Sequence, residues 1–459
     1  MHPTREASLK EALKEATRIL DLLMKPELTE EEKGAIVSES IENYTDYVNP
    51  AILKVRKSVS TDYSFVEWED EGAVFRDTHG IEFIDCLGGY GIYMLGHRNP
   101  KVVEVVKRQL NRYALHSQEL VEPLRGYLSK LVAMVTPGDI QYSFICNGGA
   151  EAIEMALKLA RLSSGKKCFI STIGAFHGKS MGAVSATGKA VYREPYLPLV
   201  PGFFHVEYGD AEAVEKAIKS LTSVGETVAA VIVEPIQGEG GIIIPPDDYL
   251  PSLREICDHY GVYLITDEIQ TGMGRTGTFW AVDRYDVVPD ILVMGKAFGG
   301  GVMPITAIAA RPHLWERMKE NPYILGSPTF GGNPLSCSAA IAAIKYTLEW
   351  DVPRMAKEKG DYILKHLLEL KERYPEVLVD VRGRGLLIGM EFPSDEVGFY
   401  VSKKMFEKRV LIGGTLNNAR VCRIEPPAII SYEQIERVLE VLEYALGEAD
   451  KEFRERKAG

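Results

Sequence analysis

The sequence predicts an α/β protein with a large domain built on a mostly parallel β-sheet and a smaller α/β domain. Between residues 141 and 330, short apolar runs alternate with stretches of helical periodicity, which is typical of a parallel sheet covered by helices. Several of these runs end in glycine-rich turns and polar residues. With 459 residues, 46% of them hydrophobic, the chain can also bury more than one core.

The expected strands of the large domain are short and rich in apolar residues. They are Gln141–Cys146, Lys167–Thr172, Val228–Glu234, Val262–Thr266 and Asp290–Met294. Helical periodicity lies between several of them, at Ala150–Leu162, Ala211–Leu221 and Pro251–Tyr260. Functional side chains are therefore expected just after the carboxyl ends of the strands.

We expect three parts along the chain: an N-terminal helical arm (1–53), a small domain made from both ends (54–95 and 335–459) and a large domain (96–334). Thr29 and Glu32 have the spacing of a capping box at the start of an arm helix. Apolar stripes at helical spacing are expected to be core, both in 434–446 and in the arm at Leu9, Leu13, Ala16 and Leu20.

Composition narrows the classes of function. The chain has 65 acidic and 53 basic residues and a formal charge of −12, which is the wrong sign for binding nucleic acid or anionic lipid without sequence preference. The first forty residues lack the apolar stretch of a signal peptide, and no apolar run approaches the ~18 residues of a membrane span. A cytoplasmic protein is expected. The six cysteines form no CxxC pair and are expected to be buried reduced thiols, with no metal site.

A buried acid and a buried lysine each follow an apolar strand. The first run ends in Asp267 and Glu268, and an acid in such a place needs a cationic partner. The second ends at Lys296, followed by a glycine-rich turn. Because burial favours the neutral amine, Lys296 is suited to form a Schiff base.

Two further turns have the chemistry of a cofactor site. Asn147-Gly148-Gly149-Ala150 leads from a strand into a helix, so that backbone N–H groups are free to bind a phosphate. Phe176 and His177 lie in a tight turn where a flat ring can stack. A lysine, a carboxylate, a phosphate nest and an aromatic side chain together indicate pyridoxal 5'-phosphate.

The sequence resembles the class III aminotransferases of fold type I, most closely the members that act on putrescine. The resemblance covers nearly the whole chain and rests on the stretches Asp46–Pro50, Phe83–Gly91, Gly96–Pro100, Glu234–Gly241, Gly331–Pro334 and Arg423–Pro427.

The resemblance implies a role for several residues. Lys296 is expected to hold the cofactor and move the proton between substrate and cofactor carbons, with Asp267 at the ring nitrogen. Gln270 is expected near the phenolic oxygen, with the ring of Phe176 stacked on the cofactor. Gly149 and Ala150 would bind the phosphate. Thr329 would contact the phosphate of a neighbouring subunit, which implies a homodimer.

The family motif usually reads Asn-Ser-Gly-Thr, so two hydroxyl donors are absent from Asn147–Ala150 here. We expect the backbone donors to retain the cofactor, with a loss of about 0.5–1.5 kcal/mol for one hydrogen bond.

The resemblance also implies a reaction. The amino group of putrescine, and also of cadaverine, would pass to 2-oxoglutarate, giving 4-aminobutanal and glutamate. Arg423 would bind the acceptor carboxylate. Because a fixed arginine repels a cationic donor, Glu234 is expected to neutralise it in the first half-reaction.

Several alternatives remain open at this point. Within the family they are ornithine, acetylornithine and 4-aminobutyrate aminotransferases, and within the fold an amino-acid racemase or epimerase. A binding protein with an inactive site is disfavoured because Lys296 and Asp267 are both present. The GxGxxG pattern at 272–277 is not expected to open a helix, and the sequence 177–180 lacks the first glycine of a P-loop, so nucleotide binding is disfavoured.

Overall fold

The computed structural model describes residues 5–60 and 63–458. The chain forms two compact units, of which the first extends up to Asp70 and includes Phe75–Glu82, and the second contains Glu71–Val74 and the chain from Phe83 onward. The first unit contains three α-helices, a short π-helix (Tyr44–Val48) and most residues of two strands. The α-helices are α1 (Arg5–Leu23), α2 (Glu30–Asn43) and α3 (Pro50–Lys54), and the strands are β1 (Glu67–Glu71) and β2 (Val74–Asp77). The predicted capping box begins α2, because Thr29 and Glu32 each accept a hydrogen bond from the other's backbone N–H.

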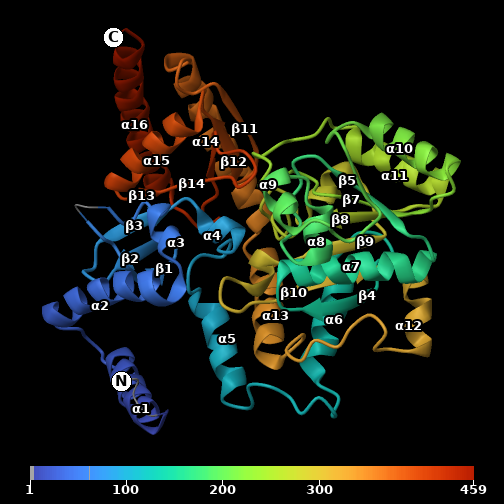
Figure 1. The fold of residues 1–459 in the computed structure, drawn as a ribbon, viewed down its shortest axis with the longest axis horizontal. Helices are drawn as coiled ribbons and strands as arrows, with labels where there is room; N and C mark the ends of the chain where they lie inside the picture. The colour runs from blue at the N-terminus through green and yellow to red at the C-terminus, as the bar shows by residue number, and fades with distance from the viewer. Residues whose placement is uncertain (1–4, 61–62, 459) are drawn as a thin grey trace. The chain divides into compact units, whose positions relative to one another are not determined.

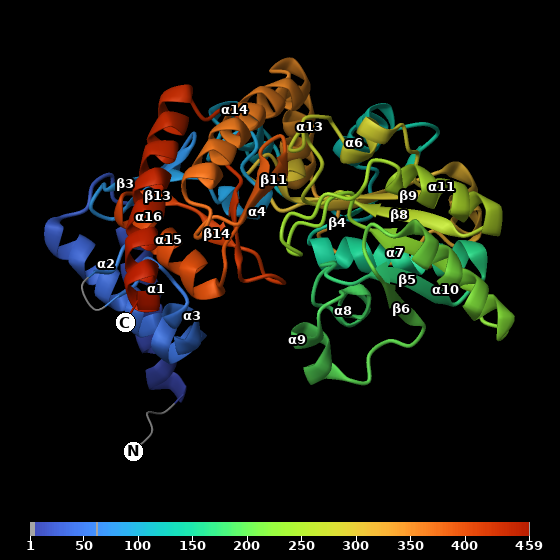
Figure 2. The same cartoon turned by 90° about the horizontal axis from the view of Figure 1, so that it is seen from above.

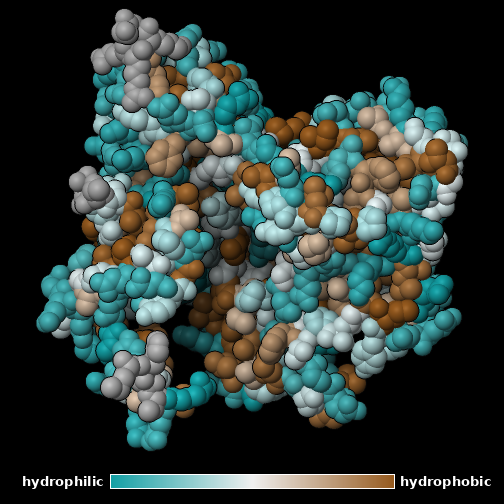
Figure 3. Space-filling view, viewed as in Figure 1, coloured by the Kyte–Doolittle hydropathy of each residue, from teal (hydrophilic) through white to brown (hydrophobic). Residues whose placement is uncertain are grey.

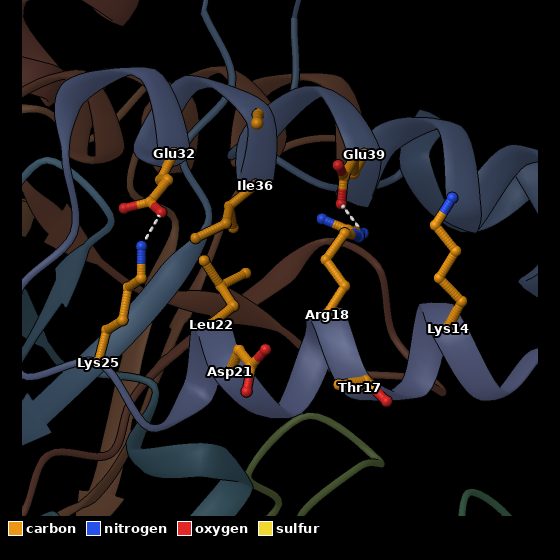
Figure 4. Close-up of a pocket in the computed structure, with 10 residues that line it drawn as sticks. Lys14, Thr17, Arg18, Asp21, Leu22, Lys25, Glu32, Ile36 and Glu39 are labelled. Carbon is orange, nitrogen blue, oxygen red and sulfur yellow. Dashed lines mark hydrogen bonds and ion pairs between the residues drawn. The ribbon is translucent and has the colours of Figure 1, made fainter.

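The expectation that the apolar stripe of the arm is core is wrong for this chain. Helix α1 buries none of its residues, and Leu13 is 70% exposed. An ion pair between Arg18 and Glu39 connects α1 to α2 instead, and Lys25, just after α1, pairs with Glu32 of α2 (Figure 4). The shallow pocket between these helices has a largely charged and polar lining and contains none of the candidate catalytic residues.

The second unit is built on a seven-stranded sheet, which confirms the predicted α/β class (Figure 1). Strand β10 runs antiparallel to both its neighbours, and the pairs from β9 to β6 are parallel. The strands, in spatial order, are β4 (Tyr142–Cys146), β10 (Thr306–Ala310), β9 (Ile291–Met294), β8 (Tyr263–Asp267), β7 (Val228–Val233), β5 (Cys168–Thr172) and β6 (Phe203–Val206). The five predicted strands lie within one or two residues of β4, β5, β7, β8 and β9, and β6 and β10 were not predicted.

Both faces of this sheet are buried. Along β7, Val231 and Val233 belong to one core, with α10 (Ala211–Ser223) and α11 (Tyr249–Tyr260). Ile232 belongs to the other core, with α7 (Gly149–Ser164) and α8 (Met181–Ala186). Figure 2 shows α7 on one side of the strands and α6 and α13 on the other. Burial on both faces explains why the strands are uninterrupted apolar runs.

The C-terminal part of the second unit has a smaller antiparallel sheet and three long helices. The sheet order is β11 (Asp380–Arg384), β12 (Leu387–Glu391), β15 (Val421–Ile424) and β14 (Gly413–Gly414). The predicted core stripe of 434–446 is confirmed, since Ile435, Leu442 and Leu446 are buried. The helices here are α14 (Val352–Arg373), α15 (Asp395–Glu407) and α16 (Tyr432–Ala458).

Several further elements belong to the second unit. Strand β13 (Val410–Leu411) pairs in parallel with β3 (Glu82–Asp85). All six cysteines are free and buried. None of the helices within the described residues is long and apolar enough to cross a membrane. The other helices are α4 (Gly88–Gly91), α5 (Pro100–Leu110), α6 (Pro123–Val135), α9 (Ala190–Arg193), α12 (Glu316–Glu320) and α13 (Pro334–Glu349).

Candidate active site

The candidate residues gather at one edge of the large sheet. Strands β7, β8 and β9 are parallel neighbours in register, with Thr266 opposite Val233 and Asp267 opposite Val293. Their carboxyl ends therefore meet, and the polar residues that follow or end them, Glu234, Asp267 and Lys296, lie at the same edge.

Asp267 is buried and held by two donors. Its Oδ2 lies 2.8 Å from Nδ1 of His177, and its Oδ1 accepts the backbone N–H of Ile269 at 3.1 Å. Burial alone lowers the pKa of His177, but the Asp267 carboxylate outweighs burial, so this pKa lies above its ordinary value. His177 thus fixes the orientation of the Asp267 carboxylate at the site, a role that its place in the sequence did not indicate.

Lys296 begins a short 3₁₀ helix, Lys296–Gly299, directly after β9. Its φ angle is +46°, a left-handed backbone conformation that residues other than glycine rarely adopt. Such backbone strain is concentrated at functional sites. Burial lowers the pKa of the Lys296 amine. Burial thus favours the neutral form of this amine, and the Schiff base expected at Lys296 remains a prediction.

The expected phosphate nest is the amino terminus of α7. The helix begins at Gly149, and the N-cap residue Gly148 has no side chain that could accept a hydrogen bond from the first turn. The first backbone N–H groups are therefore left for a ligand. A Cβ atom at Gly149 would lie 3.2 Å from Ile269, the residue that contacts Asp267. The uncapped terminus therefore lies beside the buried aspartate.

Phe176 is half-buried in the turn after β5, and its backbone N–H donates to Glu234 Oε1 at 2.9 Å. The Gln270 amide donates to the backbone carbonyl of Tyr90 at 3.3 Å and to both carboxylate oxygens of Glu425 at 3.2 Å. Both side chains belong to the same site, and their contacts with the cofactor remain a prediction.

The structure corrects the expected partner of Arg423. The guanidinium is fully buried, and its Nη2 lies 2.5 Å from Oε2 of Glu239, not of Glu234. Burial opposes ionisation of Glu239, yet the Arg423 guanidinium holds the pKa of that carboxyl below its usual value. The ring of Tyr90 lies over the guanidinium at 5.1 Å.

Glu234 has a different task. Its two oxygens accept the backbone N–H groups of Phe176 and Gly238, at 2.9 and 3.0 Å. Burial raises the pKa of Glu234 to about 7. The residue joins the turn after β5 to the turn after β7, while Arg423 is paired with Glu239. Glu234 and Glu239 belong to the same stretch, 234–241, and the sequence pattern did not indicate which of them would pair with Arg423.

Thr329 is exposed, and its carbonyl oxygen accepts a hydrogen bond from Gln118 Nε2 at 2.7 Å. Its expected contact with a neighbouring subunit remains a prediction.

The glycines of the rival pattern at 272–277 serve packing. A Cβ at Gly272 would lie 2.5 Å from the Trp280 ring, and one at Gly277 would lie 3.2 Å from Lys357 in α14. As expected, this stretch opens no helix within the described residues, and a dinucleotide fingerprint needs one.

The residues present fit pyridoxal 5'-phosphate. Asp267 and its histidine offer a fixed carboxylate for the ring nitrogen, Lys296 an amine for the aldehyde, and the uncapped amino terminus of α7 a place for the phosphate. At this terminus the backbone N–H groups would bind the phosphate without the two hydroxyl groups of the usual family motif.

Glu268, next to Asp267, gives the stability of the protein a predictable pH dependence. Its oxygens accept the backbone N–H of Val282 at 2.9 Å and the Thr271 hydroxyl, and burial raises its pKa from 4.5 to about 7. Between these values the folded protein holds a proton that the unfolded chain releases. The free energy of unfolding therefore falls as the pH rises through this window.

We expect Glu268→Gln to remove this contribution, which amounts to roughly 3 kcal/mol between acid and neutral pH. Urea unfolding of both proteins across this pH range measures it. An equally steep decline in the variant would contradict the burial of an unfavourable charge at Glu268.

Comparisons with known proteins agree with this geometry. The family model for class III aminotransferases matches residues 57–446. The chain is similar to the ornithine aminotransferase of Toxoplasma gondii ME49, with 31% identity, coverage of 90% of this chain and 99% of that one, and a TM-score of 0.79. It is also similar to an aminotransferase of Bacillus anthracis, with 26% identity, coverage of 92% of this chain and 100% of that one, and a TM-score of 0.82.

An amine transaminase from an uncultivated Pseudomonas species, solved with pyridoxal phosphate bound, is also similar. Its identity is 26%, with coverage of 86% of this chain and 98% of that one and a TM-score of 0.79. The uncapped helix, the buried aspartate and the buried lysine are consistent with these similarities. The chain belongs to the class III aminotransferases, and pyridoxal 5'-phosphate is its cofactor.

Proposed function

We propose that the protein transfers a primary amino group from a diamine, putrescine and also cadaverine, to 2-oxoglutarate, with 4-aminobutanal and glutamate as the products from putrescine. The observation that carries this proposal is the buried pair of Arg423 and Glu239. A paired arginine presents no net charge to a cationic donor. When Glu239 moves away, the same arginine can bind the carboxylate of an oxo acid.

The chain's own residues divide the work. The bound cofactor supplies an aldehyde that takes up the donor amine and a ring that withdraws electrons. Nζ of Lys296, whose pKa is lowered by burial, removes the proton from the amine-bearing carbon of the donor. Asp267, oriented by His177, would hold the ring nitrogen. The Phe176 turn, anchored by Glu234, would cover one face of the ring.

Ornithine is the second candidate donor, with acetylornithine and 4-aminobutyrate as further carboxylate-bearing amines. The similarity to an ornithine aminotransferase at 31% identity supports ornithine. The similarity to an amine transaminase supports a donor without a carboxylate. Since one methylene in a pocket is worth only about 1–3 kcal/mol, we expect putrescine and cadaverine both to react.

The near-visible spectrum of the purified holoenzyme tests the function. Putrescine added without an oxo acid should remove the yellow band of the lysine-bound cofactor, and 2-oxoglutarate should restore it. Ornithine in a parallel sample is the comparison. A spectrum that putrescine leaves unchanged while ornithine converts it would replace the diamine with the amino acid.

The exchange at Arg423 predicts unequal effects on the two half-reactions. Glu239→Gln removes the charge that neutralises Arg423, so the putrescine half-reaction should slow by about tenfold or more, the worth of one charged hydrogen bond. The 2-oxoglutarate half-reaction should be retained, because the arginine no longer has to leave a partner. Single-turnover rates of each half measure both effects.

Glu234→Gln is the matched control, since it alters a buried glutamate that does not contact Arg423. It should affect both half-reactions alike. If Glu239→Gln also slows both halves equally, the exchange at Arg423 is wrong.

We also propose that the protein is a homodimer in which Thr329 reaches the cofactor of the neighbouring subunit. Hydrophobic side chains at the end of α5, in the following loop and in α6 are exposed in the single chain, and Val121 is 98% exposed. Figure 3 shows hydrophobic residues gathered over α5 and α13. Patches of this kind on a single chain mark protein interfaces. The exposed residues include Leu110, Leu115, Leu120, Tyr127, Met134 and Phe330.

The mass in solution should be that of two chains, and Val121→Glu should shift it toward one, as measured by sedimentation equilibrium. The monomer should bind the cofactor less tightly because it lacks the partner's Thr329. A wild-type protein that sediments as a fully active monomer would contradict this assembly. Leu13→Glu on the exposed face of α1 is the control, and it should leave the mass unchanged.

A further inference from the structure

Glu425 is a buried carboxylate whose partners are all weak or distant. Its side chain is fully buried, yet its one hydrogen-bond donor among the described residues is the Gln270 amide, shared between both oxygens at 3.2 Å. Arg423 Nη1 and Arg275 Nε lie 3.6 and 3.8 Å from it, beyond the distance of a charged hydrogen bond. A carboxylate in this setting retains lone pairs for a stronger cationic partner.

The two arginines are engaged elsewhere. Arg423 makes its short contacts with Glu239 and, at 3.2 Å, with the carbonyl of Gly414. Arg275 donates from Nη1 to the carbonyls of Leu386 and Pro426. The two arginines equal Glu239 and Glu425 in number of charges, but neither arginine makes a hydrogen bond to Glu425.

Glu425 faces the space beside Lys296. A Cβ atom at Gly91 would lie 2.7 Å from Oε1 of Glu425 and 3.6 Å from Cδ of Lys296. The carboxylate and the reactive lysine therefore both lie close to Gly91, and a side chain at this position would clash with Glu425. The Gly91 φ angle of +100° favours glycine there as well.

We propose that Glu425 binds the distal ammonium of a diamine donor while the proximal amine reacts at Lys296. The proposal rests on the aminotransferase function and names the group that selects its donor. Extended 1,4-diaminobutane places its two nitrogens about 6 Å apart, five bonds of about 1.5 Å. Such a molecule is long enough to extend from the reacting position beside Lys296 to the nearby carboxylate of Glu425.

The same charge discriminates against amino acids. A donor with a carboxylate at its far end, such as ornithine, brings a negative group toward Glu425 and loses the attraction that a diamine gains. Burial raises the pKa of Glu425 above its ordinary value. An ammonium beside Glu425 would favour the charged carboxylate and so oppose the effect of burial.

The test compares putrescine with butylamine, a monoamine of equal length that lacks the distal charge. First-half-reaction rates are measured on the holoenzyme of the wild type and of Glu425→Gln. We expect the wild type to prefer putrescine by about tenfold or more, and Glu425→Gln to bring the ratio of the two rates close to one. Ornithine should gain relative to putrescine in the variant.

A merely structural role would lower both rates together and leave their ratio unchanged, which would overturn the proposal. Glu268→Gln, another buried glutamate without a place beside Lys296, should keep the wild-type ratio. A wild type that converts butylamine but not putrescine would refute the diamine function itself. A wild type that prefers putrescine, together with a variant that keeps this preference, would refute only the role of Glu425.

A second variant keeps the test decisive if Glu425→Gln does not fold. Glu425→Asp retains the charge and withdraws the carboxylate by one methylene, so the preference should shift from putrescine toward cadaverine. An unshifted preference in a folded Glu425→Asp protein would also overturn the proposal.

Discussion

The active site depends on three parallel strands that end at the same edge of the large sheet. Because β7, β8 and β9 are hydrogen-bonded in register, Glu234, Asp267 and Lys296 follow or end them side by side, although 62 positions separate the first from the last in the chain. The rigidity of a sheet buried on both faces keeps these groups in place. The turns after the strands then need little flexibility of their own.

Around this edge the protein buries more charge than a stable core needs, and it compensates each charge differently. Asp267 is held by a histidine and a backbone N–H, Glu234 by two backbone N–H groups and Arg423 by Glu239. Glu425 alone among these groups has neither a short charged partner nor a backbone N–H donor to its carboxylate within the described residues. Incomplete compensation of a buried charge costs stability, and such sites are where ligand charge is expected.

Much of the site was predictable because it is local in the sequence. A strand followed by a glycine turn and a helix, as at Asn147–Ala150, has the same geometry wherever it occurs, and the structure places the uncapped end of α7 there. The lysine after β9 and the aspartate that ends β8 follow the same rule. Strand β10 escaped prediction because three of its five residues are alanine, which is depleted in strands, and β6 because it lies at the edge of the sheet and buries none of its four residues fully. The arm stripe was misread because helical periodicity shows which face is apolar, not whether anything covers it.

By itself the sequence determined the α/β class, the cofactor and the residues at strand ends, because these follow from periodicity and from turns a few residues long. Only the tertiary structure decided the partners of the buried charges. Glu234 and Glu239 occur in the same short stretch, yet Glu239 meets Arg423, 184 positions away, because the turn after β7 packs against β15. Glu425 likewise lies near Lys296, because both side chains approach Gly91. Contacts between distant parts of the chain depend on packing, which no local pattern of residues contains.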